Sequence, residues 1–427
     1  MILTNDQQKA LEGLQSFVLD DTHIYVLQGY AGTGKSTLLK EFLKQLPDLL
    51  AGYTLVNPAY VPRHIAFTAT THKAVENLMG ILPISYTSLL TTTASAFGMR
   101  LQQAAASGKP PKLVFAGNRA LKFGRHSLIF IDEASYLDSE LLSHISRIAV
   151  EMETKIVFIG DPAQLTPVMS NHSPVFSAGF PTSSLTEVVR QAKTNPIMDL
   201  VTEYRNAVRT KVFPAIPHGL PEIQYMDVRE EVADYLKAHF SDPAWNPNHS
   251  RILGYTNNRV TLYNDWLAEK IEGSSLLVEG GYYLNNRGVN LNSCLLPASA
   301  TVLVLGITRP FDSVAGITGS WLTLAHNGNV LPHLVFAPHN YRDWAYQHKI
   351  WIKEDNQEAL HLSSTWVDLR RLYASTVNKA QGSTFDECFI DLADIATCRS
   401  AEQRARLLYV ATSRARNRVT FINLPRR

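Results

Sequence analysis

Residues 29–36 read Gly29-Tyr30-Ala31-Gly32-Thr33-Gly34-Lys35-Ser36, which matches the phosphate-loop pattern G-x-x-x-x-G-K-[ST]. The loop follows the apolar run 23–28, which predicts a buried strand, and precedes 37–43, which predicts an amphipathic helix. This context favours phosphate binding by backbone N–H groups over a glycine-rich turn without a ligand. We expect Lys35 to reach the β- and γ-phosphates and the Ser36 hydroxyl to bind Mg²⁺. The predicted nucleotide contacts in this segment are Gly29, Ala31, Gly32, Thr33, Gly34, Lys35, Ser36 and Thr37.

An acidic pair, Asp132 and Glu133, ends the apolar run 127–131. Such a strand end places Asp132 to hold Mg²⁺ and Glu133 to orient and deprotonate the attacking water. Two carboxylates that cap the following helix are the alternative, but a phosphate loop in the same chain favours catalysis. The sequence has no Asn-Lys-x-Asp, the guanine-reading motif of GTPases, so ATP is the expected nucleotide.

The composition is that of an ordinary folded protein, because 45% of the 427 residues are hydrophobic and 18% are charged. Lys and Arg number 40 against 38 Asp and Glu, so a polyanion would have to be held by local sites. The three cysteines, Cys294, Cys388 and Cys398, form no C-x-x-C pair, which disfavours a disulfide framework and a structural zinc site. Neither a signal peptide nor a membrane segment is recognisable, so we expect a cytoplasmic protein.

Two stretches of the chain alternate apolar strands with helices, which is typical of parallel α/β sheets. The candidate strands lie at 23–28, 64–68, 127–131 and 155–159 in the first stretch, and at 251–255, 372–375, 388–391 and 419–422 in the second. Residues 270–365 are rich in Gly, Asn and Pro with short alternating runs, and they predict a small all-β insertion. Residues 112–115 and 119–123 flank the turn 116–118 and predict a β-hairpin.

Residues 160–168 read Gly160-Asp161-Pro162-Ala163-Gln164-Leu165-Thr166-Pro167-Val168 and directly follow the candidate strand 155–159. A glutamine between two prolines at a strand end projects its amide into the cleft, so Gln164 is predicted to sense the γ-phosphate. Together with the phosphate loop and the run Ile131-Asp132-Glu133-Ala134-Ser135, this string resembles superfamily 1 DNA helicases, in the group that contains RecD and the phage Dda helicase. The resemblance spans roughly residues 1–200, 250–270 and 370–420.

The resemblance implies further nucleotide contacts. Gln7, which ends Leu-Thr-Asn-Asp-Gln at 3–7, is similar to the adenine-reading glutamine of the family, with Gln8 as the other possible register. Arg190 and Arg414 resemble two arginines that reach the γ-phosphate from separate domains, which would couple hydrolysis to domain closure. Exposed ion pairs are the alternative for each arginine.

The resemblance also implies a track for single-stranded DNA. The strings 68–74 and 376–384 would hold DNA phosphates, which positions the strand without reading its sequence. The residues concerned are Thr70, Thr71, His72, Lys73, Thr376, Asn378 and Lys379. The family usually has histidine where this chain has Asn378 and Ser95, and threonine hydroxyls that cap helices are the alternative.

Strand separation would need a wedge. Phe115, at the tip of the predicted hairpin, is the candidate because an aromatic ring can stack on the last base pair. A Phe115 that packs inward is the equal alternative. The insertion also carries aromatic candidates for a DNA-guiding surface, but a small β-barrel needs aromatics in its own core, and we expect most of them there. These residues are Trp321, Trp344, Trp351 and Trp366.

The sequence and the resemblance together predict an α/β protein with two RecA-like parallel-sheet domains and ATP at their interface. Residues 1–178 would form the first domain, with the hairpin insertion at about 98–125. Residues 179–269 and 366–427 would form the second, and 270–365 would form a small SH3-like β-barrel inserted in it.

The implied function is an ATP-dependent helicase that moves 5′ to 3′ on single-stranded DNA and opens the duplex at single-strand/double-strand junctions. It would be a phage-type monomer in the cytoplasm of a bacterium or phage-infected host, with a replication or recombination protein as a partner. Two alternatives stay open. One is a translocase that displaces proteins or remodels DNA intermediates with little unwinding, and the other is a regulatory ATPase with little motor activity.

Overall fold

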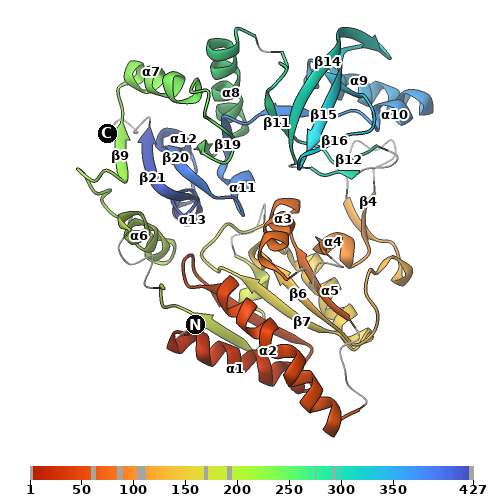
Figure 1. Ribbon diagram of the computed structural model, residues 1–427, viewed down its shortest axis with the longest axis vertical. Coiled ribbons are helices and arrows are strands. Elements are labelled where there is room, and N and C mark those ends of the chain that lie inside the picture. The colour runs from red at the N-terminus through yellow and green to blue at the C-terminus, as the bar shows by residue number, and fades with distance from the viewer. Residues whose placement is uncertain are drawn as a thin grey trace. The chain divides into compact units, whose positions relative to one another are not determined.

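Two units make up the chain in the computed structural model, and each is built around its own parallel sheet (Figure 1). The first unit comprises Met1–Gln102, Leu113–Glu222 and Cys398–Ser413, and the second comprises Gln103–Lys112, Ile223–Thr397 and Arg414–Arg427. The structure describes residues 3–58, 64–83, 90–102, 112–167, 172–189, 195–274, 276–291, 295–298 and 300–422.

The first unit has eight strands and seven α-helices among its described residues. The strands are β1 (Ile24–Gly29), β2 (His64–Ala69), β3 (Leu90–Thr92), β4 (Met99–Gln102), β5 (Lys112–Phe115), β6 (Ser127–Asp132), β7 (Lys155–Gly160) and β8 (Thr182–Leu185). The helices are α1 (Asn5–Leu19), α2 (Lys35–Val56), α3 (His72–Ile81), α4 (Thr93–Ala96), α5 (Ser139–Glu151), α6 (Pro196–Thr210) and α13 (Ala401–Thr412).

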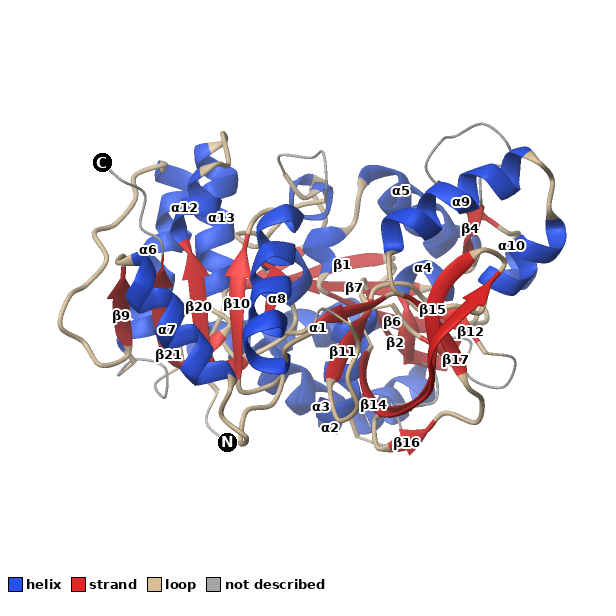
Figure 2. Cartoon of the chain, turned by 90° about the horizontal axis from the view of Figure 1, so that it is seen from above, coloured by secondary structure: helices blue, strands red, loops and turns tan. Residues whose placement is uncertain are grey.

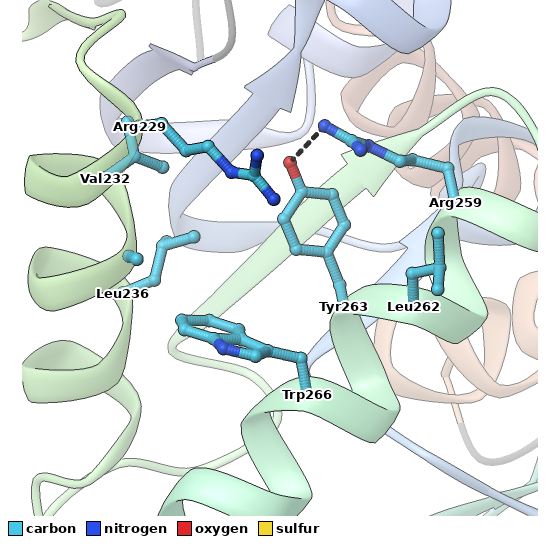
Figure 3. Close-up of a pocket in the computed structure, with 8 residues that line it drawn as sticks. Arg229, Val232, Leu236, Arg259, Leu262, Tyr263 and Trp266 are labelled. Atoms are coloured by element: carbon cyan, nitrogen blue, oxygen red, sulfur yellow. Dashed lines mark hydrogen bonds between the residues drawn. The ribbon is translucent and has the colours of Figure 1, made fainter.

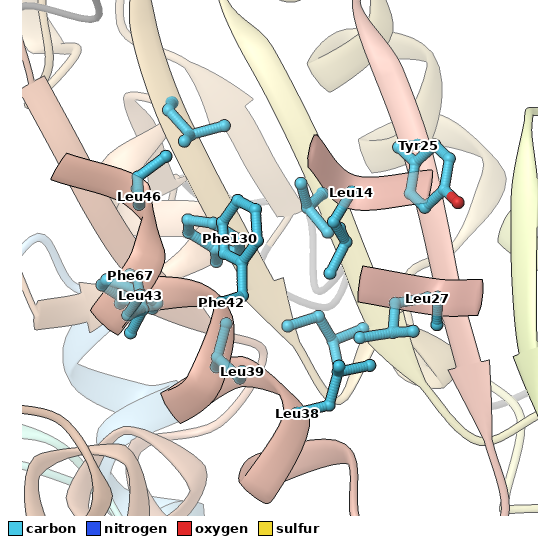
Figure 4. Packing of buried hydrophobic residues seen from close by; sticks show 14 of the residues in the cluster. Leu14, Tyr25, Leu27, Leu38, Leu39, Phe42, Leu43, Leu46, Phe67 and Phe130 are labelled. Carbon is cyan, nitrogen blue, oxygen red and sulfur yellow. The ribbon is translucent and has the colours of Figure 1, made fainter. Parts of the chain in front are cut away.

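The main sheet of this unit has the order β3-β2-β6-β7-β1-β8, and all of its pairs are parallel. Alternate residues of each strand face opposite layers, as the two-residue period of a strand requires. Tyr25 and Leu27 of β1 join the cluster that α1, α2 and α3 cover (Figure 4), whereas Ile24 and Val26 join the cluster beneath α5. Burial on both faces explains the near-continuous apolar runs from which the strands were predicted.

The boundary predicted at residue 178 is wrong for this sheet. β8 pairs with β1, with Val26 opposite Thr182 and Gly29 opposite Leu185. Helices α6 and α13, which were predicted to lie in the second domain, also cluster with the first unit. The apolar face of α6 is buried there, and it is formed by Ile197, Leu200, Val201, Tyr204, Ala207 and Val208. The first unit therefore includes segments that lie well beyond the predicted boundary in the sequence.

The predicted hairpin around 116–118 is also wrong. β5 pairs with β4, which precedes it, and residues 103–111 between them lie outside the described part of the chain. Residues Asn118–Ala120 form a 3₁₀ turn instead of opening a strand. Phe123 is buried edge-on against Phe97, with ring centroids 5.0 Å apart. The packing of Phe123 against the core therefore determines the structure here, and the Ala-Gly-Asn turn does not lead into a second strand.

The second unit has six α-helices and thirteen strands among its described residues. Its helices are α7 (Arg229–Phe240), α8 (Asn257–Glu272), α9 (Tyr341–Lys353), α10 (Gln357–Ser363), α11 (Val377–Ala380) and α12 (Leu392–Ala396). Its strands are β9 (Ile223–Met226), β10 (Ser250–Gly254), β11 (Tyr282–Asn285), β12 (Val289–Asn290), β13 (Leu295–Leu296), β14 (Thr301–Val314), β15 (Ile317–His326), β16 (Asn329–Val330), β17 (Val335–Pro338), β18 (Leu369–Arg371), β19 (Ala374–Thr376), β20 (Phe385–Asp391) and β21 (Ala415–Ile422).

The main sheet of the second unit has the order β19-β10-β20-β21-β9, again with parallel pairs (Figure 2). It contains the four strands predicted for this half of the chain. β9 and β21 pair across a long sequence separation, with Val419 opposite Ile223. The fold class predicted from the strand pattern, α/β with two parallel sheets, is therefore confirmed.

The insertion contains an antiparallel sheet in the order β16-β15-β14-β11-β18, with β17 paired to β15. It is not all-β, because α9 and α10 lie within the predicted range 270–365. Trp344 and Trp351, seven residues apart on α9, are both buried and pack with Trp366. Trp321 is partly buried against Phe336. The expectation that most of these tryptophans belong to the core is confirmed, while closure into an SH3-like barrel stays a prediction.

Among the helices that the structure describes, none is both long enough and apolar enough to cross a membrane.

Candidate nucleotide site and DNA-facing segments

The phosphate loop connects β1 to α2 in the first unit. Gly32 and Gly34 have φ values of +76° and +80°, in the left-handed region that favours glycine. Gly34 is the N-cap of α2 and no side chain caps this helix, so the N–H groups of its first turn point toward an external acceptor. Gly29 is required by space, since a Cβ there would lie 2.8 Å from the Thr33 hydroxyl and 2.9 Å from the Leu185 Cβ.

Lys35 is the first residue of α2. Its ammonium group donates to the carbonyl oxygens of Gly29, at 2.5 Å, and of Tyr30, at 3.1 Å. The same ammonium is near enough to Asp132 for its charge to oppose the rise in the pKa of that carboxyl. The charges of Lys35 and of the acidic strand end therefore influence each other, while their shared role at a nucleotide stays a prediction.

Asp132 ends β6, and burial together with the charge of Glu133 raises the pKa of its carboxyl to about 7. The Glu133 N–H, which donates to Asp132 Oδ1 at 2.9 Å, and the charge of Lys35 act in the opposite direction. A carboxylate in this position is stabilised by a nearby cation. One carboxylate and the Ser36 hydroxyl are hard oxygen ligands of the kind that Mg²⁺ prefers when nucleotide phosphates complete its shell.

Glu133 follows with a φ of +53°, which is an unusual backbone conformation for a residue other than glycine. Its carbonyl oxygen accepts a hydrogen bond from the Thr70 hydroxyl at 3.2 Å. The short helix Ala134–Tyr136 begins directly after it. Backbone strain of this kind is found at functional sites, where the surrounding structure holds the residue in place. No cap hydrogen bond from the Glu133 side chain accompanies this helix start, which disfavours the capping alternative.

Gln7 lies against the phosphate loop. Its side chain donates to the Thr33 carbonyl oxygen at 3.0 Å and accepts from the Thr4 N–H at 3.0 Å, as part of a capping box at the start of α1. Gln8 is exposed and bonds Glu12. The structure thus places Gln7, and not Gln8, beside the loop, while its contact with adenine stays a prediction.

The turn after β7 carries Gln164, whose predicted role is to sense phosphate. Asp161 organises the turn, because its Oδ1 accepts from the Ala163 N–H at 2.8 Å and its carbonyl oxygen accepts from the Gln164 N–H at 3.2 Å. Both Asp161 and Gln164 are buried. The γ-phosphate contact of Gln164 stays a prediction.

Helix α13 supplies contacts to both loops that the sequence reasoning missed. Arg406 Nη1 donates to the carbonyl oxygens of Pro162 and Gln164, each at 2.7 Å. The Tyr409 hydroxyl donates to Asp161 Oδ2 and accepts from the Ala31 N–H at 2.9 Å. Both residues precede Arg414 on the chain, and neither was among the predicted site residues. Their i, i+3 spacing puts them on one helix face, but it does not indicate what that face contacts.

The two predicted arginines have different outcomes. Arg190 lies outside the described residues, although the segment before it is held to α1 by Asp6, which accepts from the Thr186 N–H at 2.9 Å. Arg414 is buried in the second unit, and its Nη1 donates to the Ser383 carbonyl oxygen at 3.3 Å. The phosphate contacts of both arginines stay predictions.

The segments predicted to face DNA begin two helices. Thr71 caps α3 by accepting from the Ala74 N–H at 3.2 Å, and Thr376 caps α11 by accepting from the Lys379 N–H at 3.3 Å. The helix-cap interpretation therefore describes both hydroxyls. Lys73 pairs with Glu76 at 3.0 Å.

The remaining members of this set lie beside these caps. His72 is in the first turn of α3, where burial lowers the pKa of its imidazole. The ammonium of Lys379 donates to Asn286 Oδ1 at 2.5 Å, and burial lowers its pKa. Asn378 is the second residue of α11. Their phosphate contacts stay predictions.

Phe115 is not at a hairpin tip. It ends β5, packs partly buried against the core beneath α5, and its ring lies 4.5 Å from the His144 ring. The guanidinium of Arg147 lies 5.5 Å from the same ring. The inward-packed alternative is therefore the observed one. The Phe115 ring makes contacts with side chains of α5 that it would not have in solvent.

A pocket of about 290 Å³ lies in the second unit between α7 and α8 (Figure 3). Arg259 and Tyr263 on its wall both donate to Asp391 Oδ2, at 2.6 and 2.9 Å. The residues that line it are Arg229, Val232, Ala233, Leu236, Arg259, Leu262, Tyr263 and Trp266. None of the residues predicted to contact nucleotide or DNA is among them.

Comparison with known proteins agrees with this arrangement. A family model described as an AAA domain matches residues 3–214, and one described as a UvrD-like helicase C-terminal domain matches residues 371–422. The ATP-dependent DNA helicase Dda of Enterobacteria phage T4 is 22% identical, over 98% of this chain and 99% of its own length. The RecBCD enzyme subunit RecD of Buchnera aphidicola is 32% identical, over 40% of this chain and 28% of its own length.

One solved structure, of Pif1 helicases at forked double-stranded DNA, shares the fold with a TM-score of 0.50 and 17% identity. That similarity covers 98% of this chain and 92% of the Pif1 chain. The first family model covers the phosphate loop, and the second covers the segment that contains Arg414. The chain belongs to the superfamily 1 helicases, in the group that contains Dda, Pif1 and RecD.

Proposed function

We propose that this chain is an ATP-dependent DNA helicase. The observation that carries the proposal is the phosphate loop itself, in which Gly32 and Gly34 have left-handed backbones and no side chain caps the start of α2. The charge of Lys35 also acts on the Asp132 carboxyl, which Glu133 follows. A nucleoside triphosphate with its Mg²⁺ would bind at these groups. The phosphates would replace the carbonyl partners of Lys35, and Mg²⁺ would neutralise Asp132.

Each residue then has a defined task in hydrolysis. Ser36 and Asp132 would hold Mg²⁺, which supplies charge neutralisation at the phosphates when bound. Glu133 would orient the attacking water and accept its proton. Gln164, Arg190 and Arg414 would contact the γ-phosphoryl group as charge develops on it.

Single-stranded DNA is the proposed track, held at its phosphates by the N-terminal turns of α3 and α11. Thr71 and Thr376 order these turns as caps, which leaves backbone N–H groups at helix starts for phosphate oxygens. We assign 5′ to 3′ movement, a monomeric state and a replication or recombination protein as partner to the same proposal.

A translocase with little unwinding is the second candidate. Phe115, the wedge predicted from sequence, packs partly buried against α5 and not at a hairpin tip. This placement favours movement on single strands over strand separation by that residue.

One experiment separates the two functions. Forked duplexes with a single 5′ or 3′ tail are incubated with ATP and Mg²⁺, and release of the labelled strand is followed. In parallel, a protein bound to the end of a single strand is offered for displacement. A helicase opens the 5′-tailed substrate, whereas a translocase displaces the protein and opens neither. The Lys35→Ala protein serves as the control without hydrolysis, and opening of the 3′-tailed substrate alone would reverse the polarity.

A further inference from the structure

The face of α13 that bears Arg406 and Tyr409 reaches two loops of the first unit at once. Tyr409 is fully buried, and its hydroxyl lies between the backbone of the phosphate loop and the carboxylate of the turn after β7. Arg406 holds the backbone of that same turn on either side of Ala163. Neither Arg406 nor Tyr409 was predicted from the sequence to act at this site.

The chemistry of the groups sets the direction of this hydrogen-bond chain. The Ala31 N–H can only donate, so the Tyr409 oxygen accepts from it and the single Tyr409 proton goes to Asp161. A chain from amide to hydroxyl to carboxylate polarises each member, and burial strengthens every step. Asp161 in turn organises the Gln164 turn through its other oxygen and its carbonyl.

We propose that Tyr409 is a positioning residue for ATP hydrolysis, which fixes the backbone of the phosphate loop at Ala31 relative to the turn that carries Gln164. The proposal rests on the function proposed above and deepens it. Tyr409 acts through Ala31 and Asp161 and need not touch the nucleotide.

The expected kinetic effect follows from this indirect role. Most of the binding energy for nucleotide comes from the amides of the loop and from Lys35, which Tyr409 does not replace. Hydrolysis depends on the relative placement of two loops, and a displacement of about 1 Å can cost on the order of a hundredfold in rate. Loss of the hydroxyl should therefore lower kcat and leave nucleotide affinity nearly unchanged.

The test compares two tyrosines in the same unit. Tyr409→Phe removes the proposed link, and Tyr25→Phe removes a hydroxyl that is also buried but bonds Ser183 at 2.6 Å, away from the phosphate loop. ATPase activity is measured with saturating single-stranded DNA, and affinity by titration with a fluorescent ATP analogue. Tyr409→Phe should lower kcat at least about tenfold with affinity within about threefold, and Tyr25→Phe should match wild type in both.

A Tyr409→Phe protein with kcat within twofold of wild type overturns this proposal alone. So does one in which kcat and affinity fall in equal proportion, since that is damage to the nucleotide site as a whole. An unaltered chain that hydrolyses no ATP overturns the proposed function and this proposal with it.

A second variant covers the case in which Tyr409→Phe does not fold. Asp161→Asn keeps the volume of the side chain and removes the charge that the Tyr409 proton meets. It should show the same signature, with kcat lowered and affinity kept. If both single variants fold, the loss of kcat in the double variant should equal the larger single loss, because both break one chain. If the two losses of kcat multiply in the double variant, Tyr409 and Asp161 act independently, which would contradict the proposed linkage.

Discussion

At the scale of single residues, Lys35 meets two kinds of partner. Its ammonium bonds the carbonyl oxygens of Gly29 and Tyr30, and its charge acts on Asp132. We expect Lys35→Ala to lower DNA-stimulated ATPase activity more than about a hundredfold, because a charge that stabilises the transferring phosphoryl group is lost. The thermal melting temperature should stay near that of wild type, since α2 is anchored by its buried leucines. Turnover close to wild type with a matching melt would refute the assignment.

Glu133 is expected to act later in the reaction than Lys35. Glu133→Gln keeps the size of the side chain and removes the proton acceptor, so ATP binding should persist while hydrolysis falls at least about a hundredfold. Equilibrium binding and single-turnover hydrolysis measure the two effects separately. Loss of binding with normal turnover of bound ATP would mean that the tasks given to Asp132 and Glu133 are exchanged.

His239 gives a prediction about pH. Burial, with the charges of His249 and Arg418, lowers its pKa to about 4, and its Nε2 bonds the Ser250 hydroxyl at 2.8 Å. The folded state thus holds a neutral imidazole that the unfolded chain protonates near pH 6.5. This contribution to stability is complete above pH 6.5 and is lost as the pH falls toward 4.

The free energy of unfolding should therefore fall between pH 7.5 and pH 5. His239→Gln retains a donor near the Nε2 position and does not titrate, so its unfolding free energy should fall less between pH 7.5 and pH 5. Urea unfolding at the two pH values provides the measurement. Equal falls for both proteins would show that another group dominates in this range.

At the scale of elements, the position of Phe115 at the end of β5 leads to a prediction opposite to the one made from the sequence, where Phe115 was the wedge. Because Phe115 packs on His144 and Arg147 of α5, we expect Phe115→Ala to lower the free energy of unfolding by roughly 1–3 kcal/mol. The ratio of unwinding rate to ATPase rate should not change. Urea unfolding and a forked-duplex assay check the two statements. An unchanged unfolding midpoint together with selective loss of unwinding would restore the wedge.

The elements also show what could be predicted. Parallel strands such as β6 and β7 were recognisable because burial on both faces leaves an uninterrupted apolar run. The helices α9 and α10 were missed, because the Gly- and Asn-rich turns around them gave a β-like signal and the heptad spacing of Trp344 and Trp351 was not read as a helix face. The partner of β5 was missed because Gly117 signals a turn locally, while the pairing with β4 is set by the core.

The candidate site divides in the same way. The phosphate loop and the pair Asp132–Glu133 could be found because their spacing is dictated by one turn or one strand end. Tyr409 and Arg406 could not be selected from spacing alone, because their partners lie 248 and 242–244 residues away in the chain. Only the fold brings α13 against the loops.

At the scale of the whole molecule, α13 makes the first unit depend on distant chain. We expect a fragment of residues 1–222 to melt earlier and to be cleaved faster by protease than the same unit in the full chain, because the face of α6 that packs on α13 becomes exposed. Fusion of residues 398–413 to this fragment through a flexible Gly/Ser linker is the matched control and should recover much of the difference. Equal melting of the two fragments would show that α6 is held without α13.

The same dependence has a consequence for synthesis of the protein. Ala31 and Tyr409 are 378 residues apart, and a ribosome adds about 5–20 residues per second, so the phosphate loop waits on the order of 20–80 s for its hydroxyl partner. During this interval the nascent chain lacks the Tyr409 hydroxyl that bonds Asp161 Oδ2, and it exposes the apolar face of α6, which is the kind of surface that chaperones bind. A helix translated late thus completes the domain whose translation began first.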